Sequence, residues 1–226
     1  RVLERGCWSE VEHFAGALHS PERAGWQVGA VANDGFEVLF NGVSQGQLLW
    51  ALMGEHNAHN ALAAIAAARH VGVTPAVAIE ALGQFANVKR RMEVKGSVKG
   101  ITVYDDFAHH PTAITTTIAG LRDKIGKKAR ILAVLEPRSN TMKLGTMKAA
   151  LPASLVDADL VFCYGANLGW DPSDALAPLG DKARSFIDLE PLIQAITDAA
   201  QAGDQILVMS NGGFGGIHDK LLAALS

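Results

Sequence analysis

The spacing of apolar and polar positions divides the chain into two parts with different predicted architectures. In the first part, three short segments rich in apolar and β-branched residues are separated by turn residues, at 26–32, 36–40 and 48–52, with Asn33-Asp34-Gly35 and Asn41-Gly42 between them. Helical spacing follows at 56–70, and Pro75 begins a second predicted helix that ends near residue 85. This part is predicted to be a small antiparallel meander followed by two helices.

From residue 92 onward, strand-like and helix-like segments alternate. The predicted strands are 94–98, 102–104, 131–135, 160–164 and 205–209, and the predicted helices are about 111–123, 142–155, 189–201 and 216–225. Such alternation predicts βαβ units on a mostly parallel sheet, which is an α/β fold. We therefore expect a domain boundary near residues 87–91.

The segments that follow the predicted strands are polar or rich in glycine. In open α/β sheets ligands bind beyond the carboxyl ends of the strands, so these segments are where chemistry is expected. They are 105–111, 136–140, the stretch after 160–164 that reaches residue 171, and 210–216. We expect these four loops to converge on one edge of the sheet.

Composition and charge argue against a nucleic-acid-binding protein and against a membrane-spanning one. The chain has 226 residues, 49% of them hydrophobic and 19% charged, with a formal net charge of -3, which argues against a broad nucleic-acid interface. The longest apolar run, 61–68, is far shorter than the roughly 18 residues of a membrane span. Two cysteines in no metal-binding spacing favour a reducing compartment, the cytoplasm. The absence of an initiator Met suggests a piece cut from a longer protein.

Two short motifs each have both a functional and a structural interpretation. Asn57 and Asn60 lie three residues apart on one helix face, where their amides could read an adenine edge or simply flank the helix start. The basic run 89–91 at the domain junction could place a guanidinium on a phosphate or form a solvated linker.

The densest group of ionisable residues is Asp105, Asp106, His109 and His110, followed by Pro111 at a predicted helix start. Carboxylates and imidazoles suit a metal centre, and they equally suit nucleotide binding, with an Asp on ribose and a His near phosphate. A structural cluster is the third interpretation. The glycine-rich stretch 210–216 does not meet the dinucleotide fingerprint, and the chain contains no P-loop.

Taken in chain order, these motifs resemble the Mur ligase family, the ATP-dependent amide ligases of peptidoglycan assembly. The resemblance rests on GEHNAHNALAA at 54–64, RRME at 90–93, YDDFAHHPTA at 104–113, EPRSNTMKLG at 136–145 and MSNGGFGGIH at 209–218. It covers essentially the whole chain and is most specific from residue 54 onward.

The resemblance implies two domains, 1–90 as the C-terminal part of the central ATPase domain and 91–226 as the Rossmann-like C-terminal domain. It implies ATP and Mg²⁺ as cofactors, with the P-loop and the main magnesium ligands outside this chain. The implied reaction of peptidoglycan recycling joins UDP-N-acetylmuramate to L-alanyl-γ-D-glutamyl-meso-diaminopimelate through an acyl phosphate. Small molecules, not nucleic acid or membrane, are the implied partners, and the chain alone is expected to be inactive.

The resemblance also implies roles for residues of the nucleotide site. Asn57 and Asn60 are expected to contact adenine, and Asp106 to hold ribose. Arg91 and His109 are expected at the ATP phosphates as catalytic groups. Closure of the C-terminal domain about a hinge at 87–91 is expected to complete this site.

The incoming peptide is expected at a different loop. Arg138, Ser139 and Asn140 stand where relatives bind the amino acid or peptide. A relative that adds diaminopimelate has an arginine motif after the next strand, whereas GANLGWDP at 165–172 has no arginine. The diaminopimelate contacts are therefore not transferred to this chain.

Three alternatives to this ligase remain open from the sequence. L-alanine, or the substrate of another Mur ligase, could replace the tripeptide. A metal-dependent phosphoesterase could be built on the 105–110 cluster if Glu136, Asp171 or His218 completed its ligands. A nucleotide-binding domain without catalysis would describe the chain alone.

Overall fold

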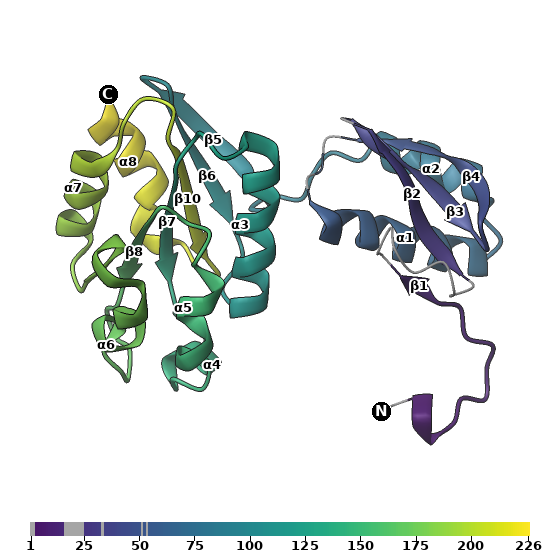
Figure 1. The fold of residues 1–226 in the computed structure, drawn as a ribbon, viewed down its shortest axis with the longest axis horizontal. Coiled ribbons are helices and arrows are strands. Elements are labelled where there is room, and N and C mark those ends of the chain that lie inside the picture. The colour runs from purple at the N-terminus through teal and green to yellow at the C-terminus, as the bar shows by residue number, and fades with distance from the viewer. Residues whose placement is uncertain (1–2, 16–24, 33, 51, 53) are drawn as a thin grey trace. The chain divides into compact units, whose positions relative to one another are not determined.

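The computed structural model describes residues 3–15, 25–32, 34–50, 52 and 54–226, and it divides the chain into two compact units. The first unit is Arg1–Ala86 and the second is Asn87–Ser226. Each unit has its own hydrophobic core, so each is described by itself (Figure 1).

The first unit is a four-stranded sheet with two helices, as far as its described residues show. Its elements are the 3-10 helix η1 Leu3–Arg5, β1 Phe14–Ala15, β2 Trp26–Ala32, β3 Gly35–Phe40, β4 Val43–Leu49, α1 Glu55–His70 and α2 Pro75–Gly83. Strands β2, β3 and β4 pair antiparallel, and β1 pairs parallel with β2. Asn41 (φ 51°) and Gly42 (φ 78°) form the tight turn between β3 and β4, as Asn-Gly predicts.

Apolar side chains of α1 and α2 pack onto one face of this sheet. Trp26 and Leu48 from the strands are fully buried against Leu62 and Ile65 of α1. The predicted meander and helices are confirmed here, although β4 begins and ends earlier than the predicted 48–52. Polar residues occupy the start of β4, which hides it from a hydrophobic pattern. Asn33 and Ala51, which fall in the predicted turn and strand, lie outside the described residues.

The second unit is an α/β sandwich. Its elements are β5 Glu93–Val98, β6 Ile101–Asp106, α3 Pro111–Ile125, β7 Ile131–Glu136, α4 Asn140–Lys143, η2 Lys148–Ala150, α5 Leu151–Ser154, β8 Leu160–Tyr164, α6 Pro172–Leu176, η3 Ala177–Lys182, β9 Ala183–Phe186, α7 Leu189–Ala199, β10 Gln205–Ser210, η4 Phe214–Gly216 and α8 Ile217–Leu225. Within its described residues the sheet has the order β5-β6-β10-β7-β8-β9, and only β5 runs antiparallel. The predicted α/β fold with a mostly parallel sheet is confirmed.

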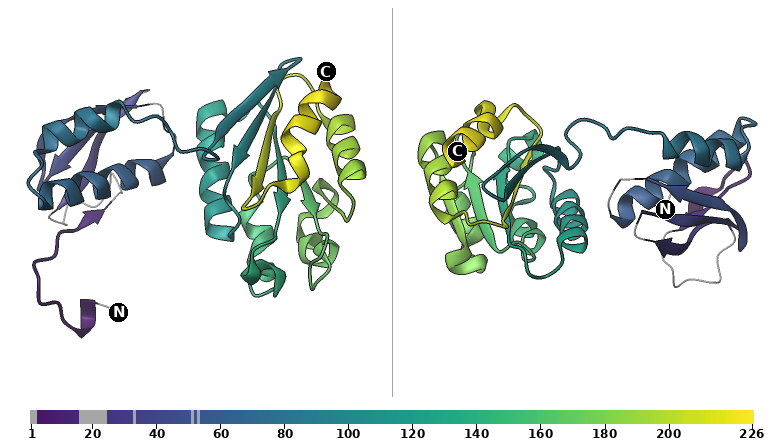
Figure 2. Two further views of the ribbon diagram at one scale, coloured as in Figure 1. Left: turned by 180° about the vertical axis from the view of Figure 1, so that it is seen from behind. Right: turned by 90° about the horizontal axis from the view of Figure 1, so that it is seen from above.

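Helices cover both faces of this sheet (Figures 1 and 2). Ile131, Ala133 and Leu135 of β7 point into the core shared with α3 and α5, and the alternate residues Leu132 and Val134 point into the core shared with α7 and α8. The strands are therefore apolar on both sides, which is why they appear as continuous hydrophobic runs in the sequence.

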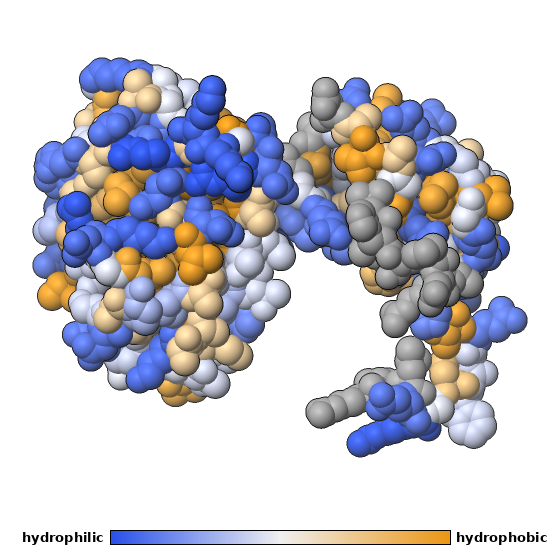
Figure 3. Space-filling view, viewed as in Figure 1, coloured by the Kyte–Doolittle hydropathy of each residue, from blue (hydrophilic) through white to orange (hydrophobic). Residues whose placement is uncertain are grey.

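The second unit differs from the sequence prediction in the helix 142–155, in strand β9 and in α6 and η3, which were not predicted. The predicted helix 142–155 is broken into α4, η2 and α5, because Gly145 turns the chain with a φ of 72°. Strand β9 was not predicted, since its four residues form only a short edge strand. On the face seen in Figure 3, apolar residues of this unit are interspersed with hydrophilic ones. No helix among the described residues is long and apolar enough to span a bilayer.

Candidate functional site

Strands β6, β10, β7 and β8 end at one edge of the sheet, which we call the carboxyl edge. Met209 pairs with Asp106, and Ser210 pairs with Glu136, so the ends of β6, β10 and β7 lie side by side. Strand β8 pairs along the other side of β7. The loops that leave these strands start together, as expected from the sequence.

Asp105 and Asp106, at the end of β6, face opposite sides of the sheet and have different partners. Asp106 is 2% exposed, and its carboxylate accepts hydrogen bonds from the N–H groups of Ala108 (2.7 Å) and Met92 (2.9 Å) and from Thr117 Oγ1 (3.3 Å). Burial raises the pKa of the Asp106 carboxyl, and these donors oppose that rise. In this arrangement the carboxylate binds its own chain, so its role on ribose stays a prediction.

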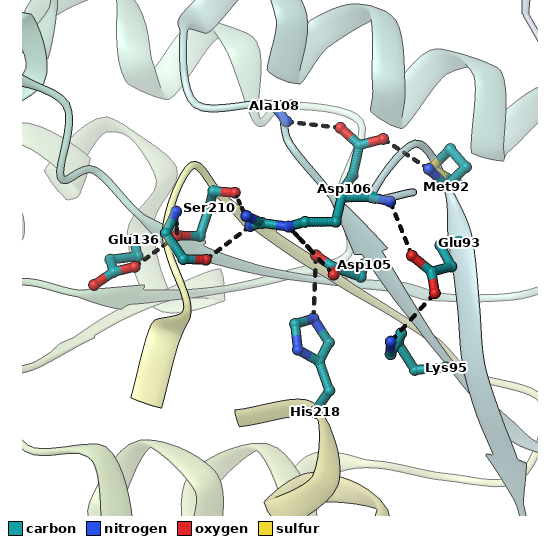
Figure 4. A network of polar contacts seen from close by, with 11 residues as sticks. Met92, Glu93, Lys95, Asp105, Asp106, Ala108, Glu136, Ser210 and His218 are labelled. Atoms are coloured by element: carbon teal, nitrogen blue, oxygen red, sulfur yellow. Dashed lines mark hydrogen bonds and ion pairs between the residues drawn. The ribbon is translucent and has the colours of Figure 1, made fainter. Parts of the chain in front are cut away.

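Asp105 belongs to an ionic network on the other side of β6 (Figure 4). Arg90 Nε lies 3.4 Å from the Asp105 carboxylate, and Nε2 of His218, in the first turn of α8, lies 3.4 Å from Asp105 Oδ1. Burial lowers the pKa of His218, and the charge of Asp105 partly offsets this. Asp105 thus holds a cationic side chain on one side and an imidazole on the other.

Arg90 continues this network into the glycine loop, which we define as residues 211–216 after β10. Its Nη2 donates to the carbonyl oxygens of Ser210 (2.5 Å) and Gly212 (2.8 Å), and its guanidinium stacks 5.2 Å from the centre of the Phe107 ring. The backbone of Arg90 has a φ of 61°, a costly conformation for a residue other than glycine. Sequence analysis did not identify this clamp, because nothing in the motif RRME distinguishes a structural arginine from a ligand-binding one.

Arg91 has the opposite environment. Its side chain is exposed, with the guanidinium 5.8 Å from the centre of the Phe107 ring, and no acceptor for its guanidinium is found among the residues that the structure describes. Burial raises the pKa of Asp106, and the charge of Arg91 partly offsets that rise. The first arginine of the pair is therefore engaged by the protein, and the second is available to a ligand.

His109 and the start of α3 lie in the loop after β6. His109 Nδ1 is 2.9 Å from the carbonyl oxygen of Phe107, and because a carbonyl only accepts, Nδ1 carries the hydrogen. The Nε2 atom of the ring is then an acceptor when the ring is neutral. His110 precedes Pro111 as the N-cap of α3, whose first N–H groups favour an anion.

The predicted peptide loop follows β7. Ser139 is the N-cap of α4 and accepts a hydrogen bond from Met142 N, and Asn140 is exposed in the first turn. Trp170 Nε1 donates to Met142 O (2.7 Å), which ties the 165–172 stretch to α4. Arg138 is exposed and lies against Gly212 of the glycine loop. The structure therefore brings Arg138 next to the Arg90 network.

Asn57 and Asn60 lie in the first unit, on one face of α1. Asn60 Nδ2 is 3.4 Å from Asn57 Oδ1, and Gly54, not either asparagine, is the N-cap of the helix. Their contact with adenine stays a prediction. The other candidate residues, Arg91, Asp106, His109 and Arg138–Asn140, all lie in the second unit.

The metal-centre interpretation of the 105–110 cluster finds no support in this geometry. Among the described residues, no group of three or more His, Cys, Asp or Glu side chains is placed to hold a metal ion. Asp105 and Asp106 diverge to opposite sides of β6, which prevents the two adjacent carboxylates from sharing a cation.

Comparison with known proteins decides the family. Residues 90–212 match the family described as "Mur ligase, glutamate ligase domain". The chain belongs to the Mur ligase family. The resemblance expected from the motifs is confirmed, and the matched segment is the part of the second unit that carries Arg90, the carboxyl edge and the start of the glycine loop.

Individual Mur ligases match over the whole chain. UDP-N-acetylmuramate–L-alanyl-gamma-D-glutamyl-meso-2,6-diaminoheptandioate ligase of Escherichia coli (strain K12) is 50% identical over 229 residues, covering 100% of this chain and 49% of that protein. The crystal structure of a murein peptide ligase from Psychrobacter arcticus 273-4 has a TM-score of 0.74 at 40% identity, covering 99% of this chain and 48% of that one. A crystallised domain from Haemophilus ducreyi 35000HP, 54% identical with a TM-score of 0.53, covers 60% of this chain and 100% of its own. The chain spans about half the length of the curated relatives it matches.

The Asp105–His218 contact generates a prediction that is independent of any ligand. Asp105→Asn removes the negative charge that favours the imidazolium, so the pKa of His218, already below its ordinary 6.5, is expected to fall further. An NMR titration of the His218 ring in the 226-residue chain measures this. Asp219→Asn is the matched control, because Asp219 acts on His218 in the same direction but more weakly. An unchanged or raised His218 pKa in Asp105→Asn would show that the two groups are not coupled.

The same shift sets the sign of a pH effect on stability. Because the pKa of His218 is lower in the folded protein than in the unfolded chain, the unfolded chain takes up the proton first. The contribution of His218 to the free energy of unfolding is therefore complete above pH 6.5 and is lost as the pH falls toward the folded pKa.

Proposed function

We propose that this chain is the nucleotide- and peptide-binding half of an ATP-dependent ligase that joins UDP-N-acetylmuramate to L-alanyl-γ-D-glutamyl-meso-diaminopimelate. The observation that carries the proposal is the 50% identity over the full chain to an E. coli protein that bears this name. The first unit is then the C-terminal part of the central ATPase domain, and the second is the Rossmann-like C-terminal domain. The reaction takes place in the cytoplasm and returns murein peptide to peptidoglycan synthesis.

The arrangement of the second unit fits a nucleotide phosphate at the carboxyl edge. Arg91 offers a guanidinium with no acceptor among the described side chains, beside a His109 ring whose Nε2 faces no partner in that part of the chain. The first N–H groups of α3 add a partial positive charge to the same loop. When bound there, ATP with Mg²⁺ would supply the phosphoryl group that activates the muramate carboxylate, with ADP as the leaving group.

The residues of this chain have distinct tasks in that reaction. Arg91 stabilises negative charge that develops on the transferred phosphoryl group, because its guanidinium has no acceptor among the described residues and can pair with that charge as it appears. His109 assists at the same phosphates. Asn57 and Asn60 bind the adenine ring, and Asp106 holds ribose.

The incoming peptide is bound by the loop after β7. Arg138 grips a peptide carboxylate, since a guanidinium presents two parallel donors to the two carboxylate oxygens. Ser139 and Asn140 add neutral hydrogen bonds to the peptide, and Ser139 also caps the start of α4. The peptide amine is thereby held where it attacks the activated muramate carbonyl. The amide bond forms as the bond between the carbonyl carbon and the phosphate oxygen breaks, so inorganic phosphate leaves and the proton lost by the amine passes to solvent.

The direct test is a ligation assay with the intact protein that contains this chain. We expect ATP-dependent amide formation from UDP-N-acetylmuramate and the tripeptide, with L-alanine a much poorer acceptor. The 226-residue chain alone is expected to form no product, because it contains no P-loop to hold the β and γ phosphates. Preference for L-alanine would assign the chain to a different Mur ligase. Ligation by the 226-residue chain would contradict the proposal that a P-loop outside this chain is needed to hold the β and γ phosphates.

The exposed guanidinium of Arg91 gives a second prediction. In the intact ligase, Arg91→Ala is expected to lower kcat about 100-fold with a smaller change in the KM for ATP, because a contact to the transition state is lost. Lys89→Ala is the matched control, since it removes an equal charge from an exposed position two residues away. Kinetics with varied ATP measures both. Equal effects of the two substitutions would show that Arg91 contributes only general positive charge.

A further inference from the structure

We propose that Gly212 is a specificity-determining position, because it has no side chain and the Arg138 guanidinium lies in the space that a side chain would fill. From there the guanidinium binds a carboxylate of the incoming peptide. We call the bare backbone of Gly212 in contact with Arg138 the seat. The proposal rests on the proposed function for the identity of that peptide. It concerns a residue of the glycine loop that meets no sequence fingerprint, and it assigns this glycine a role toward a side chain, not toward a phosphate.

The contact between Gly212 and Arg138 is so close that a side chain at position 212 would displace the Arg138 guanidinium. A Cβ atom built on Gly212 would overlap Nη1 of Arg138 and would lie 2.5 Å from Cζ and 2.7 Å from Cδ. Carbon atoms in contact are normally about 3.5–4.0 Å apart. The Arg138 side chain therefore lies along the bare backbone of Gly212, in the space that a methyl group would fill.

Both backbone polar groups of Gly212 are held by hydrogen bonds. The carbonyl oxygen of Gly212 accepts a hydrogen bond from Arg90 Nη2 (2.8 Å), and its N–H donates to Ser210 Oγ (2.9 Å). Ser210 Oγ in turn donates to Glu136 Oε2 (2.6 Å) at the end of β7. Figure 4 shows how these contacts converge on the turn after β10. Gly212 is thus fixed to the ends of both β6 and β7.

The base of Arg138 is fixed as well. Its N–H donates to the carbonyl oxygen of Glu136 (2.9 Å), and α4 begins two residues later under the hydrogen bond from Trp170 to Met142. The guanidinium is exposed and has no acceptor among the described residues. An arginine whose backbone is hydrogen-bonded and whose side chain lies against a fixed backbone, with its donors free, is partly preorganised for a bidentate carboxylate, since less rotamer entropy is lost on binding.

The neighbouring glycine provides a matched control. Gly213 has a φ of -76° and a ψ of -11°, and a Cβ built there meets no atom within 4 Å. Alanine fits that position without strain. At Gly212 a Cβ would meet the far end of a flexible side chain, so alanine there is expected to displace the Arg138 guanidinium without unfolding the loop.

The test is steady-state kinetics on the intact ligase with Gly212→Ala, Gly213→Ala, Arg138→Ala and the double variant Gly212→Ala/Arg138→Ala. We expect Gly212→Ala and Arg138→Ala each to raise the KM for the tripeptide about tenfold or more, with the KM for ATP and for UDP-N-acetylmuramate nearly unchanged. Gly213→Ala is expected to behave as wild type. In the double variant no further rise is expected, because both substitutions remove the same contact. The melting temperatures should agree within a few degrees.

Several outcomes would contradict the proposal that Gly212 positions Arg138. If Gly212→Ala matches Gly213→Ala while Arg138→Ala raises the tripeptide KM, Arg138 needs no seat. If Gly212→Ala raises that KM equally in the Arg138→Ala background, the glycine acts independently of the arginine. A rise in all three KM values would show a general disruption of the loop, and an unchanged tripeptide KM in Arg138→Ala would remove the arginine from peptide binding.

A measurement on the 226-residue chain separates the seat from the proposed function. The NMR signal of the Arg138 Nε–H group is expected to shift in Gly212→Ala and to stay in place in Gly213→Ala. If the intact protein does not ligate the tripeptide but this shift is observed, the proposed substrate fails and the seat stands. If the signal does not move in Gly212→Ala, the seat fails whatever the substrate is.

Discussion

The candidate site depends on one interaction, the clamp that Arg90 makes between β6 and the glycine loop. One guanidinium pairs with Asp105 and donates to two carbonyl oxygens of the turn after β10. Charge-assisted hydrogen bonds to carbonyls that leave a strand end give the following loop a single conformation. Because Gly212 is one of the two carbonyl partners, the clamp also fixes the surface on which Arg138 lies.

The Arg90 clamp fixes the conformations of loops that the sheet only brings together. The parallel register of β6, β10 and β7 brings three loops to one edge, but register alone leaves their conformations open. Arg90 joins the first two loops, and the Ser210–Glu136 hydrogen bond joins the second and third. The two adjacent arginines therefore differ in their contacts: Arg90 joins the loops, whereas the Arg91 guanidinium has no acceptor within the part of the chain that the structure describes.

Much of the fold was predictable from sequence because it depends on local patterns. The apolar runs of β7, β8 and β10, the Asn41-Gly42 turn and the proline at the start of α3 each indicate their element without tertiary information. The broken helix after residue 140 and the edge strand β9 were not predictable in this way. In the site, motif order indicated the family, but the roles of Arg90, Gly212 and Trp170 depend on partners 15 to 122 residues away, which no local pattern reveals.

The most direct test of this account is amide hydrogen exchange at the Gly212 N–H in the 226-residue chain, compared between wild type and Arg90→Lys. A lysine keeps the charge but lacks the planar fork by which Arg90 reaches Asp105 through Nε and the two carbonyl oxygens through Nη2. We predict that the Gly212 amide exchanges at least about tenfold faster in Arg90→Lys, while the amides of β10 keep their protection. Unchanged protection at Gly212 would show that the glycine loop holds its shape without Arg90 and would contradict the central role of the clamp.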